Sequence, residues 1–464
     1  MKRGYTRILA VLVALMLVVS LAACGGAKTA AGDQTAAAAS GNSADQSKSG
    51  GDQQAQPAQN IKLVFWQNAF MGPDEEKKPQ KDWFITGLIN KFEQQNPGVK
   101  IEMTVPPDQA AAHQTFKAAA MAKNGPDVAN LWSGFPLFAL KDVVLHLDGK
   151  VPQEDMDNII GWEVVRENFK SDGALLGYPV CGAELGMFIV NKKLTAKAGV
   201  DFEANPPKTV DEFMADLDKI KASGTLPIVA GEGGCNLLYV FNLGTWWVQT
   251  SGNDRIASNS LGETKYADDK AFLDSMRYAQ EMYTKGYVNK DYATCKDADA
   301  RFYQGKAAMY NTGNWDIANA QKNLGAENVT FVTVPDFQDA KVKGTGIGGP
   351  GQSCVVANYS KNPDMAIKLI SFLMNKENHT NLLKMSTKIP LRKDITVEDL
   401  GWKGNALLEK AVNIGKNYVY WDDNSQQPEV MNEFYKVGAL VVTGKMTPEQ
   451  AAEKLDKKAA EVKK

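Results

Sequence analysis

The side chains best suited to chemistry in this sequence are tryptophans that end short apolar segments. Trp66 and Trp132 each end an apolar, β-rich segment, and Trp315 follows a polar turn. A planar ring can stack on the C–H face of a sugar while neighbouring amides bond its hydroxyls, and Gln67 and Asn68 are such neighbours of Trp66. Core packing is the usual role of a tryptophan, but rings at strand ends and turns are candidates for a surface that faces a ligand.

Two adjacent tryptophans, Trp246 and Trp247, lie in a segment that reads as turn-rich and form a second candidate surface. Two neighbouring side chains cannot easily stack on one sugar. At least one of them is therefore expected to pack inside the protein.

Groups that would indicate an enzyme are scarce. The sequence has neither G-x-S-x-G nor H-E-x-x-H, and its three histidines, His113, His146 and His379, are far apart without motif partners. A glycosidase needs two carboxylates on either side of the glycosidic bond. The sequence does not exclude such a pair, although no motif indicates one. No C-x-x-C or close Cys/His spacing indicates zinc. We predict no catalytic residues, no metal site and no cofactor.

A glycine-rich segment at 344–349 formally matches G-x-G-x-x-G, the fingerprint of dinucleotide-binding proteins. That motif must open a helix whose N-terminus meets the pyrophosphate. Here Pro350 and a strand-like segment, 353–357, follow instead. The glycines therefore indicate a hinge or cleft loop whose backbone approaches a ligand, with Gly349 as the candidate contact.

The first 23 residues have the organisation of a secretory signal. Basic residues precede an apolar run, 8–19, that is shorter than the roughly 20 residues a membrane span needs. The sequence L-A-A-C at 21–24 resembles the lipobox of bacterial lipoproteins, in which Cys24 would carry a diacylglycerol after cleavage. We expect residues 1–23 to be removed and the chain to be lipid-anchored at the outer face of the cytoplasmic membrane. Ordinary secretion is the alternative.

Composition divides the rest of the chain in two. Residues 24–60 are nearly all small or polar and cannot form a core, which predicts a flexible linker. Residues 61–464 are rich in aromatic side chains and longer than one typical core, which favours two lobes. Removal of three cations with the signal leaves 49 basic against 54 acidic residues and a formal charge of −5. Because the basic residues are scattered, no nucleic-acid partner is expected.

Four cysteines remain besides Cys24: Cys181, Cys235, Cys295 and Cys354. Outside the cell four thiols allow three pairings. Separate reduced thiols and one or two disulfides fit the sequence equally well.

Local patterning predicts alternating strands and helices. Strands are expected at 61–66, 99–105 and 127–132, an amphipathic helix between the first two that breaks at 96–98, and an Ala-rich helix at 108–123. The alternation of helix and strand recurs later in the sequence. Thr209 and Glu212 have the spacing of a capping box before a helix, and residues 227–230 are predicted to form a strand. Two such α/β units facing one another would form a cleft beyond the carboxyl ends of their strands.

Several segments together resemble the family 1 extracellular solute-binding proteins, the periplasmic-binding-protein-like partners of carbohydrate ABC importers. Each segment alone is weak evidence for the family, but the order and spacing of the segments together are specific to it. The similarity spans most of residues 61–464. The segments are residues 125–128, 176–179, 188–194, 198–200, 206–213, 305–309, 313–315, 348–349 and 360–363. The resemblance implies a binding protein without catalytic activity, with a two-lobed α/β fold of type II.

The resemblance also implies discontinuous lobes joined by hinge crossovers near 180–185, near 344–353 and near Leu391. Lobe 1 would hold 61–180 plus about 350–391, and lobe 2 about 185–345 plus 392–464, with the ligand cleft between them. If the first two crossovers run side by side, a disulfide between Cys181 and Cys354 would tie the hinge.

Candidate ligand contacts follow from the resemblance as well. Relatives often place a contacting tryptophan after the strand that here contains 305–309, and a polar residue at the hinge, here Glu184, for which a solvated glutamate is the alternative. Trp421 resembles a C-terminal aromatic that some members close over the ligand. The predicted set is Trp66, Gln67, Asn68, Trp132, Glu184, Trp246, Trp247, Asn314, Trp315, Asp316, Gly349 and Trp421.

The implied mechanism is closure of the two lobes on a sugar, expected to be an oligosaccharide, followed by docking of the loaded monomer on the membrane subunits of an ABC permease. One rival is a related protein for a peptide, polyamine or metal chelate. Another is a surface carbohydrate-active enzyme, and a third is a sensor subunit that signals to a membrane kinase.

Overall fold

The computed structural model describes residues 60–463 apart from 73–74, 107–110, 233–236 and 387. Contacts divide the chain into residues 1–56 and 57–464. The predicted signal peptide, nearly all of the predicted linker, Cys24 and Cys235 lie outside the described residues. In the described part, none of the helices combines the length and apolar character that a membrane span needs.

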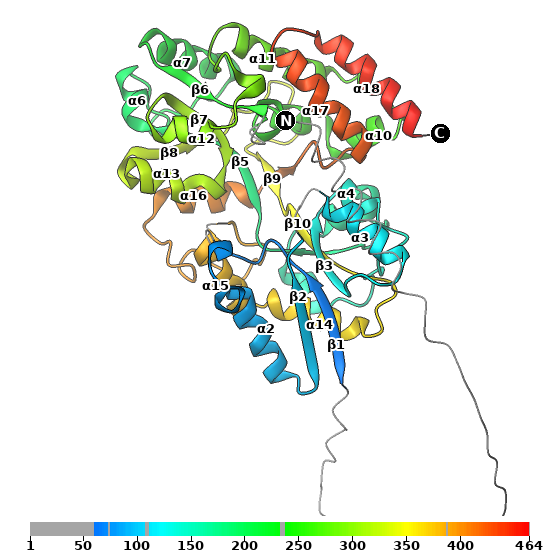
Figure 1. Cartoon of the computed structure of the whole chain (residues 1–464). Coiled ribbons are helices and arrows are strands. Elements are labelled where there is room, and N and C mark those ends of the chain that lie inside the picture. Colours follow the sequence, from blue (N-terminus) through cyan, green and yellow to red (C-terminus); the bar gives the residue numbers. More distant parts are fainter. Residues whose placement is uncertain (1–59, 73–74, 107–110, 233–236, 387, 464) are drawn as a thin grey trace, which may run out of the picture. The chain divides into compact units, whose positions relative to one another are not determined.

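Two β-sheets form the core, each with its own helices (Figure 1). The sheet of lobe 1 has the order β2-β1-β3-β10-β4, and that of lobe 2 the order β11-β9-β5-β7-β6 with β8 beside β5. Lobe 1 contains β1 (Ile61–Trp66), β2 (Val99–Thr104), β3 (Val128–Trp132), β4 (Tyr178–Val180) and β10 (Gln352–Val356). Lobe 2 contains β5 (Glu184–Asn191), β6 (Leu226–Val229), β7 (Ala307–Gly313), β8 (Val329–Val332), β9 (Gly346–Gly349) and β11 (Tyr418–Tyr420). The predicted α/β class is confirmed.

Lobe 1 begins with the βαβ progression that local patterning predicts. β1 pairs in parallel with both β2 and β3. The helix between β1 and β2 is α2 (Phe84–Gln95), and Asn96 is its C-cap residue, directly before the Pro97-Gly98 break. Its buried face consists of side chains three or four residues apart, as an amphipathic helix requires: Ile85, Leu88, Ile89 and Phe92.

The other helices of lobe 1 surround this sheet. They are α3 (Ala112–Met121), α4 (Phe135–Phe138), α5 (Gln153–Asn158), α14 (Pro363–Leu373) and α15 (Lys376–Ser386). Two short 3₁₀ turns, η3 (Trp162–Val165) and η4 (Glu167–Phe169), precede β4. α14 packs on both β10 and α2, which joins the C-terminal part of lobe 1 to its N-terminal part.

Lobe 2 is the more helical lobe. Its helices are α6 (Lys192–Lys197), α7 (Val210–Ala222), α8 (Leu238–Phe241), α9 (Gly244–Ser251), α10 (Asn253–Ser260), α11 (Lys270–Thr284), α12 (Ala298–Tyr303), α13 (Ile317–Leu324), α16 (Ala406–Gly415), α17 (Pro428–Val442) and α18 (Pro448–Val462). The capping box predicted before α7 forms in part. Thr209 Oγ1 accepts from Glu212 N at 3.2 Å, but the Glu212 carboxylate accepts from Lys208 N at 2.7 Å.

Two short crossovers join the sheets. Residues 181–183 lead from β4 to β5, and residues 350–351 lead from β9 to β10. Because β4 pairs with β10 and β5 pairs with β9, both antiparallel, the crossovers run side by side. Beyond Leu391, Lys393 N still donates to Asn158 O at 2.8 Å. The third connection and the lobe boundaries stay a prediction.

Cys181, at the first crossover, and Cys354, in β10, are both free, so the suggested disulfide between them is wrong. The register of β4 and β10 explains this result, because Cys354 faces Tyr178 whereas Val180 faces Gln352. Cys181 lies beyond Val180 and is displaced along the strands from Cys354. Cys295 is likewise buried and free.

Candidate ligand-binding site

Strand directions bring most candidate residues to two sheet edges. In lobe 1, β1 runs parallel to β3 while β10 is antiparallel to β3 and β4, so one edge carries the ends of β1, β3 and β4 and the start of β10. In lobe 2 the same logic places the start of β5 and the ends of β6, β7, β9 and β11 at one edge. The crossovers of two and three residues link these edges directly. A ligand between them would meet both lobes, beyond the strand ends where open α/β sheets bind ligands.

The lobe 1 edge carries the predicted contacts Trp66, Gln67, Asn68 and Trp132. Trp66, Asn68 and Trp132 are partly buried, and Gln67 is fully buried. Gln67 Oε1 accepts from Phe70 N at 3.1 Å, which fixes the turn after β1.

Buried polar groups lie at this edge and, in the case of Asn130, two residues before the end of β3. Four of their atoms have no hydrogen-bond partner among the described residues: Gln67 Nε2, Asn130 Oδ1, Ser133 Oγ and Gln352 Oε1. An unsatisfied buried polar atom costs about 1 to 3 kcal/mol, so native proteins seldom keep several together without a role. A ligand rich in hydroxyl groups could satisfy both the donors and the acceptors. Asn130, Ser133 and Gln352 were not predicted, because only the fold brings β3 and β10 together.

His113, in α3, supports the end of β3. Its Nε2 lies 3.2 Å from Trp132 O, and the ring centroids of His113 and Trp132 are 5.7 Å apart. Burial lowers the pKa of His113 to about 4, although the contact with the Trp132 carbonyl acts in the opposite direction. The imidazole is therefore neutral near pH 7 and holds Trp132 without adding charge to the site.

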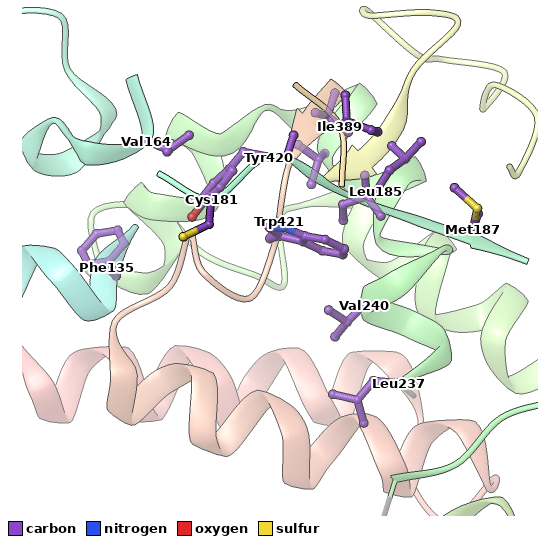
Figure 2. Packing of buried hydrophobic residues seen from close by; sticks show 14 of the residues in the cluster. Phe135, Val164, Cys181, Leu185, Met187, Leu237, Val240, Ile389, Tyr420 and Trp421 are labelled. Carbon is purple, nitrogen blue, oxygen red and sulfur yellow. The ribbon is translucent and has the colours of Figure 1, made fainter. Parts of the chain in front are cut away.

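Three aromatic rings form a cluster at the lobe 2 edge: Phe241 at the end of α8, Trp315 after β7, and Trp421 after β11. The ring centroids of Phe241 and Trp315 are 5.7 Å apart, those of Phe241 and Trp421 5.6 Å, and those of the two tryptophans 6.4 Å. Figure 2 shows Trp421 between Leu185 and Val240 of the apolar core. Phe241 was not predicted, because no feature of its local sequence distinguishes it from a core residue.

Glycine allows the Trp315 ring to lie against the backbone. A Cβ at Gly313 would be 2.1 Å from Cζ3 of Trp315. The ring therefore occupies the space of a side chain at the end of β7, and any larger residue at Gly313 would displace it.

Asn314 and Asp316 flank Trp315, and their side chains form hydrogen bonds with other residues of the protein. Asn314 Oδ1 accepts from Leu185 N at 2.9 Å, which ties the loop after β7 to the start of β5. Asp316 accepts from the hydroxyls of Tyr303 and Thr312, each at 2.8 Å. These bonds orient the turn that presents Trp315.

Glu184 begins β5 and forms an ion pair at the hinge. Its Oε1 lies 2.7 Å from Lys388 Nζ, and both side chains are mostly shielded from water. Burial works against the charged lysine, yet the Glu184 carboxylate raises the pKa of Lys388 above its usual value. Gly349 lies opposite Glu184 in the pairing of β5 with β9 and has a φ of +109°.

Glu232, which was not predicted, follows β6 at the same edge. Its Oε2 lies 3.4 Å from the Tyr239 hydroxyl, and its Oε1 is buried without a partner in the described part of the chain. Burial raises the pKa of Glu232 to about 7. The position after a predicted strand could have indicated it.

Trp246 and Trp247 lie elsewhere. Both are in α9 rather than in a turn-rich segment, and both are fully buried in the helical layer of lobe 2. The Trp246 indole donates to Pro335 O at 2.8 Å and that of Trp247 to Asp269 Oδ2 at 2.9 Å. Packing accounts for both side chains, and we leave them out of the site.

Comparisons with known proteins agree with this architecture. Residues 87–429 match the family of bacterial extracellular solute-binding proteins. The galactooligosaccharide-binding protein of Bacillus subtilis is 24% identical over 84% of this chain and 86% of its own length. The multiple sugar-binding protein of Streptococcus mutans is 24% identical over 64% of this chain and 69% of its own length.

Among solved structures, a chitin oligosaccharide binding protein superposes with a TM-score of 0.70 at 23% identity, covering 87% of this chain and 99% of its own. That similarity confirms the predicted two-lobed binding-protein fold. The family match spans more than half of the chain, and its members act outside the cytoplasm as binding proteins. This chain therefore belongs to the bacterial extracellular solute-binding protein family.

Proposed function

We propose that this chain is the sugar-binding subunit of an ABC importer and captures an oligosaccharide between its two lobes. The observation that carries the proposal is the pairing of two surfaces at adjoining sheet edges. One is the aromatic cluster Phe241, Trp315 and Trp421, and the other is the group of unpartnered polar atoms at the ends of β1 and β3. The names of the Bacillus and Streptococcus relatives support a carbohydrate ligand.

In this proposal the rings of Trp66, Trp132, Trp315 and Trp421 stack on the C–H faces of sugar rings. Hydroxyl groups bond to the amides of Gln67 and Asn130, the Ser133 hydroxyl and the carboxyl of Glu232. Because Lys388 neutralises the charge of Glu184, the main role of Glu184 is the ion pair at the hinge. Only the exposed part of its side chain contacts the ligand.

Closure completes the proposed site. A sugar held by one lobe gains contacts with the other when the lobes approach, so its binding energy shifts the population toward the closed form. We propose that the loaded monomer then docks on the membrane subunits of the importer. No chemical step belongs to this function.

A thermal-shift screen of the purified protein against mono- and oligosaccharides tests the sugar proposal. A ligand that binds only the folded state raises the melting temperature, by an amount that corresponds to about 2.7 kcal/mol at 100 times its dissociation constant. We expect a selective increase with one class of oligosaccharide. An increase with peptides or polyamines but with no sugar would refute the proposal.

We also propose that a diacylglycerol on Cys24 tethers the protein to the outer face of the cytoplasmic membrane, which the L-A-A-C sequence and the polar segment after it support. Bacteria that express the chain with labelled palmitate should incorporate label into the wild type and not into Cys24→Ser. The variant should also move from the membrane fraction to the soluble fraction. Equal labelling of both proteins would exclude Cys24 as the lipid site.

A further inference from the structure

Residues 418–424, here called the strap, contact both lobes and the candidate site. The strap belongs to lobe 2, because β11 pairs with β9 and Asn253 Nδ2 donates to Tyr420 O at 2.9 Å. One of its side chains, Trp421, packs in the aromatic cluster of the site.

Other residues of the strap bind lobe 1. The Tyr418 hydroxyl donates to Glu163 Oε1, in η3, at 2.6 Å. The backbone of Asn424 accepts from Phe135 N at 2.9 Å, and a Cβ on Gly134 would lie only 2.4 Å from Asn424 O. The strap is thus held closely at both of its ends.

Apolar contacts reinforce these bonds. The Tyr420 ring lies 5.8 Å from the Phe169 ring, which also packs 5.1 Å from Phe138. Phe169 keeps this position with a φ of +59°, a conformation that is unfavourable for a bulky residue and persists only where surrounding contacts impose it. Figure 2 shows Phe135 and Val164 of lobe 1 in the same buried cluster as Tyr420 and Trp421.

The strap also contacts the hinge between the lobes. The Tyr418 ring packs on the backbone of Gly349, where a Cβ would lie 2.6 Å from the ring. Gly349 ends β9 and is followed directly by the crossover at 350–351. Because the strap belongs to lobe 2, a rotation at this crossover moves Tyr418 relative to Glu163 of lobe 1. Trp421 moves together with the aromatic cluster of lobe 2.

We propose that the strap couples occupancy of the site to contact between the lobes, with Tyr418 and Glu163 as positioning residues that do not touch the ligand. The bond between them stabilises the lobe arrangement described here, and its loss populates other arrangements. The expected effect on the affinity for a sugar rests on the proposed function. The expected effect on the distance between the lobes does not depend on that function.

The first test measures the lobes without ligand. Spin labels on Lys117→Cys in α3 and Lys197→Cys in α6, both at exposed positions of the full chain in detergent, report the interlobe distance. We expect Tyr418→Phe and Glu163→Gln each to shift or broaden the distance distribution, and the double variant to do no more than either alone. Tyr283→Phe is the matched control, because that hydroxyl donates within lobe 2, to Lys290 O at 2.8 Å. Unchanged distributions in both strap variants would overturn the proposal.

The second test uses whichever sugars bind in the thermal-shift screen. Because the strap variants change only the fraction of binding-competent protein, they should change every dissociation constant by the same factor, about two- to tenfold. A change in the preference between two sugars would mean that Tyr418 or Glu163 touches the ligand, and it would overturn their positioning role. If no sugar binds, the function proposal fails and the distance measurement still decides on the strap.

Discussion

Trp315→Ala is expected to weaken sugar binding by roughly 30-fold or more while the protein stays folded. The Trp315 ring is partly exposed at the lobe 2 edge and is positioned by its contacts with Phe241, Trp421 and the Gly313 backbone. Its removal takes away a preformed stacking surface, whereas most of the core is untouched. Isothermal titration with the sugar found in the screen measures the affinity, and circular dichroism verifies the fold.

The control for lost packing is Trp402→Ala. Trp402 is 8% exposed, lies before α16 and belongs to neither sheet edge. This variant should lower the melting temperature without changing the affinity. Gly313→Ala should also reduce affinity by displacing the Trp315 ring, whereas Gly87→Ala adds the same atom where there is space for it. Equal affinities for Trp315→Ala and the wild type would remove Trp315 from the site.

The elements of lobe 1 could be predicted because their signals are local. α2 has apolar residues at helical spacing and a Pro-Gly break, and β1 to β3 are short β-rich segments with helices between them. The order of strand and helix then places Trp66 and Trp132 at strand ends. These positions required no knowledge of long-range contacts.

The rest of the site depends on contacts between residues distant in sequence. Glu184 and Lys388 are 204 positions apart, so no local pattern could show that the carboxylate is paired. Gln352 reaches the lobe 1 edge only because β10 returns between β3 and β4. Likewise, the segment of Trp246 and Trp247 forms a helix because the packing of lobe 2 around their indoles outweighs weak local propensity.

Acidification should destabilise the protein through two buried histidines. Burial lowers the pKa of His113 to about 4 and that of His379 to about 3. Well above pH 6.5, the usual pKa of histidine, neither the folded nor the unfolded state is protonated at these side chains. As the pH falls below 6.5, the unfolded state takes up protons that the folded state does not. The free energy of unfolding should therefore decrease, by about 3 kcal/mol for His113 alone between pH 6.5 and 4.

Urea denaturation at a series of pH values isolates this effect when variants are compared. Glu232 acts in the opposite sense, because its raised pKa of about 7 favours the folded state as the pH falls from 7 to 4.5. The raw curve therefore mixes both contributions, whereas His379→Gln removes one of them and keeps an acceptor for Leu391 N, which bonds Nε2 at 3.3 Å. This variant should flatten the pH dependence by up to about 1.4 kcal/mol per pH unit below pH 6.5. A curve for His379→Gln as steep as that of the wild type would show that His379 is not the group that resists protonation.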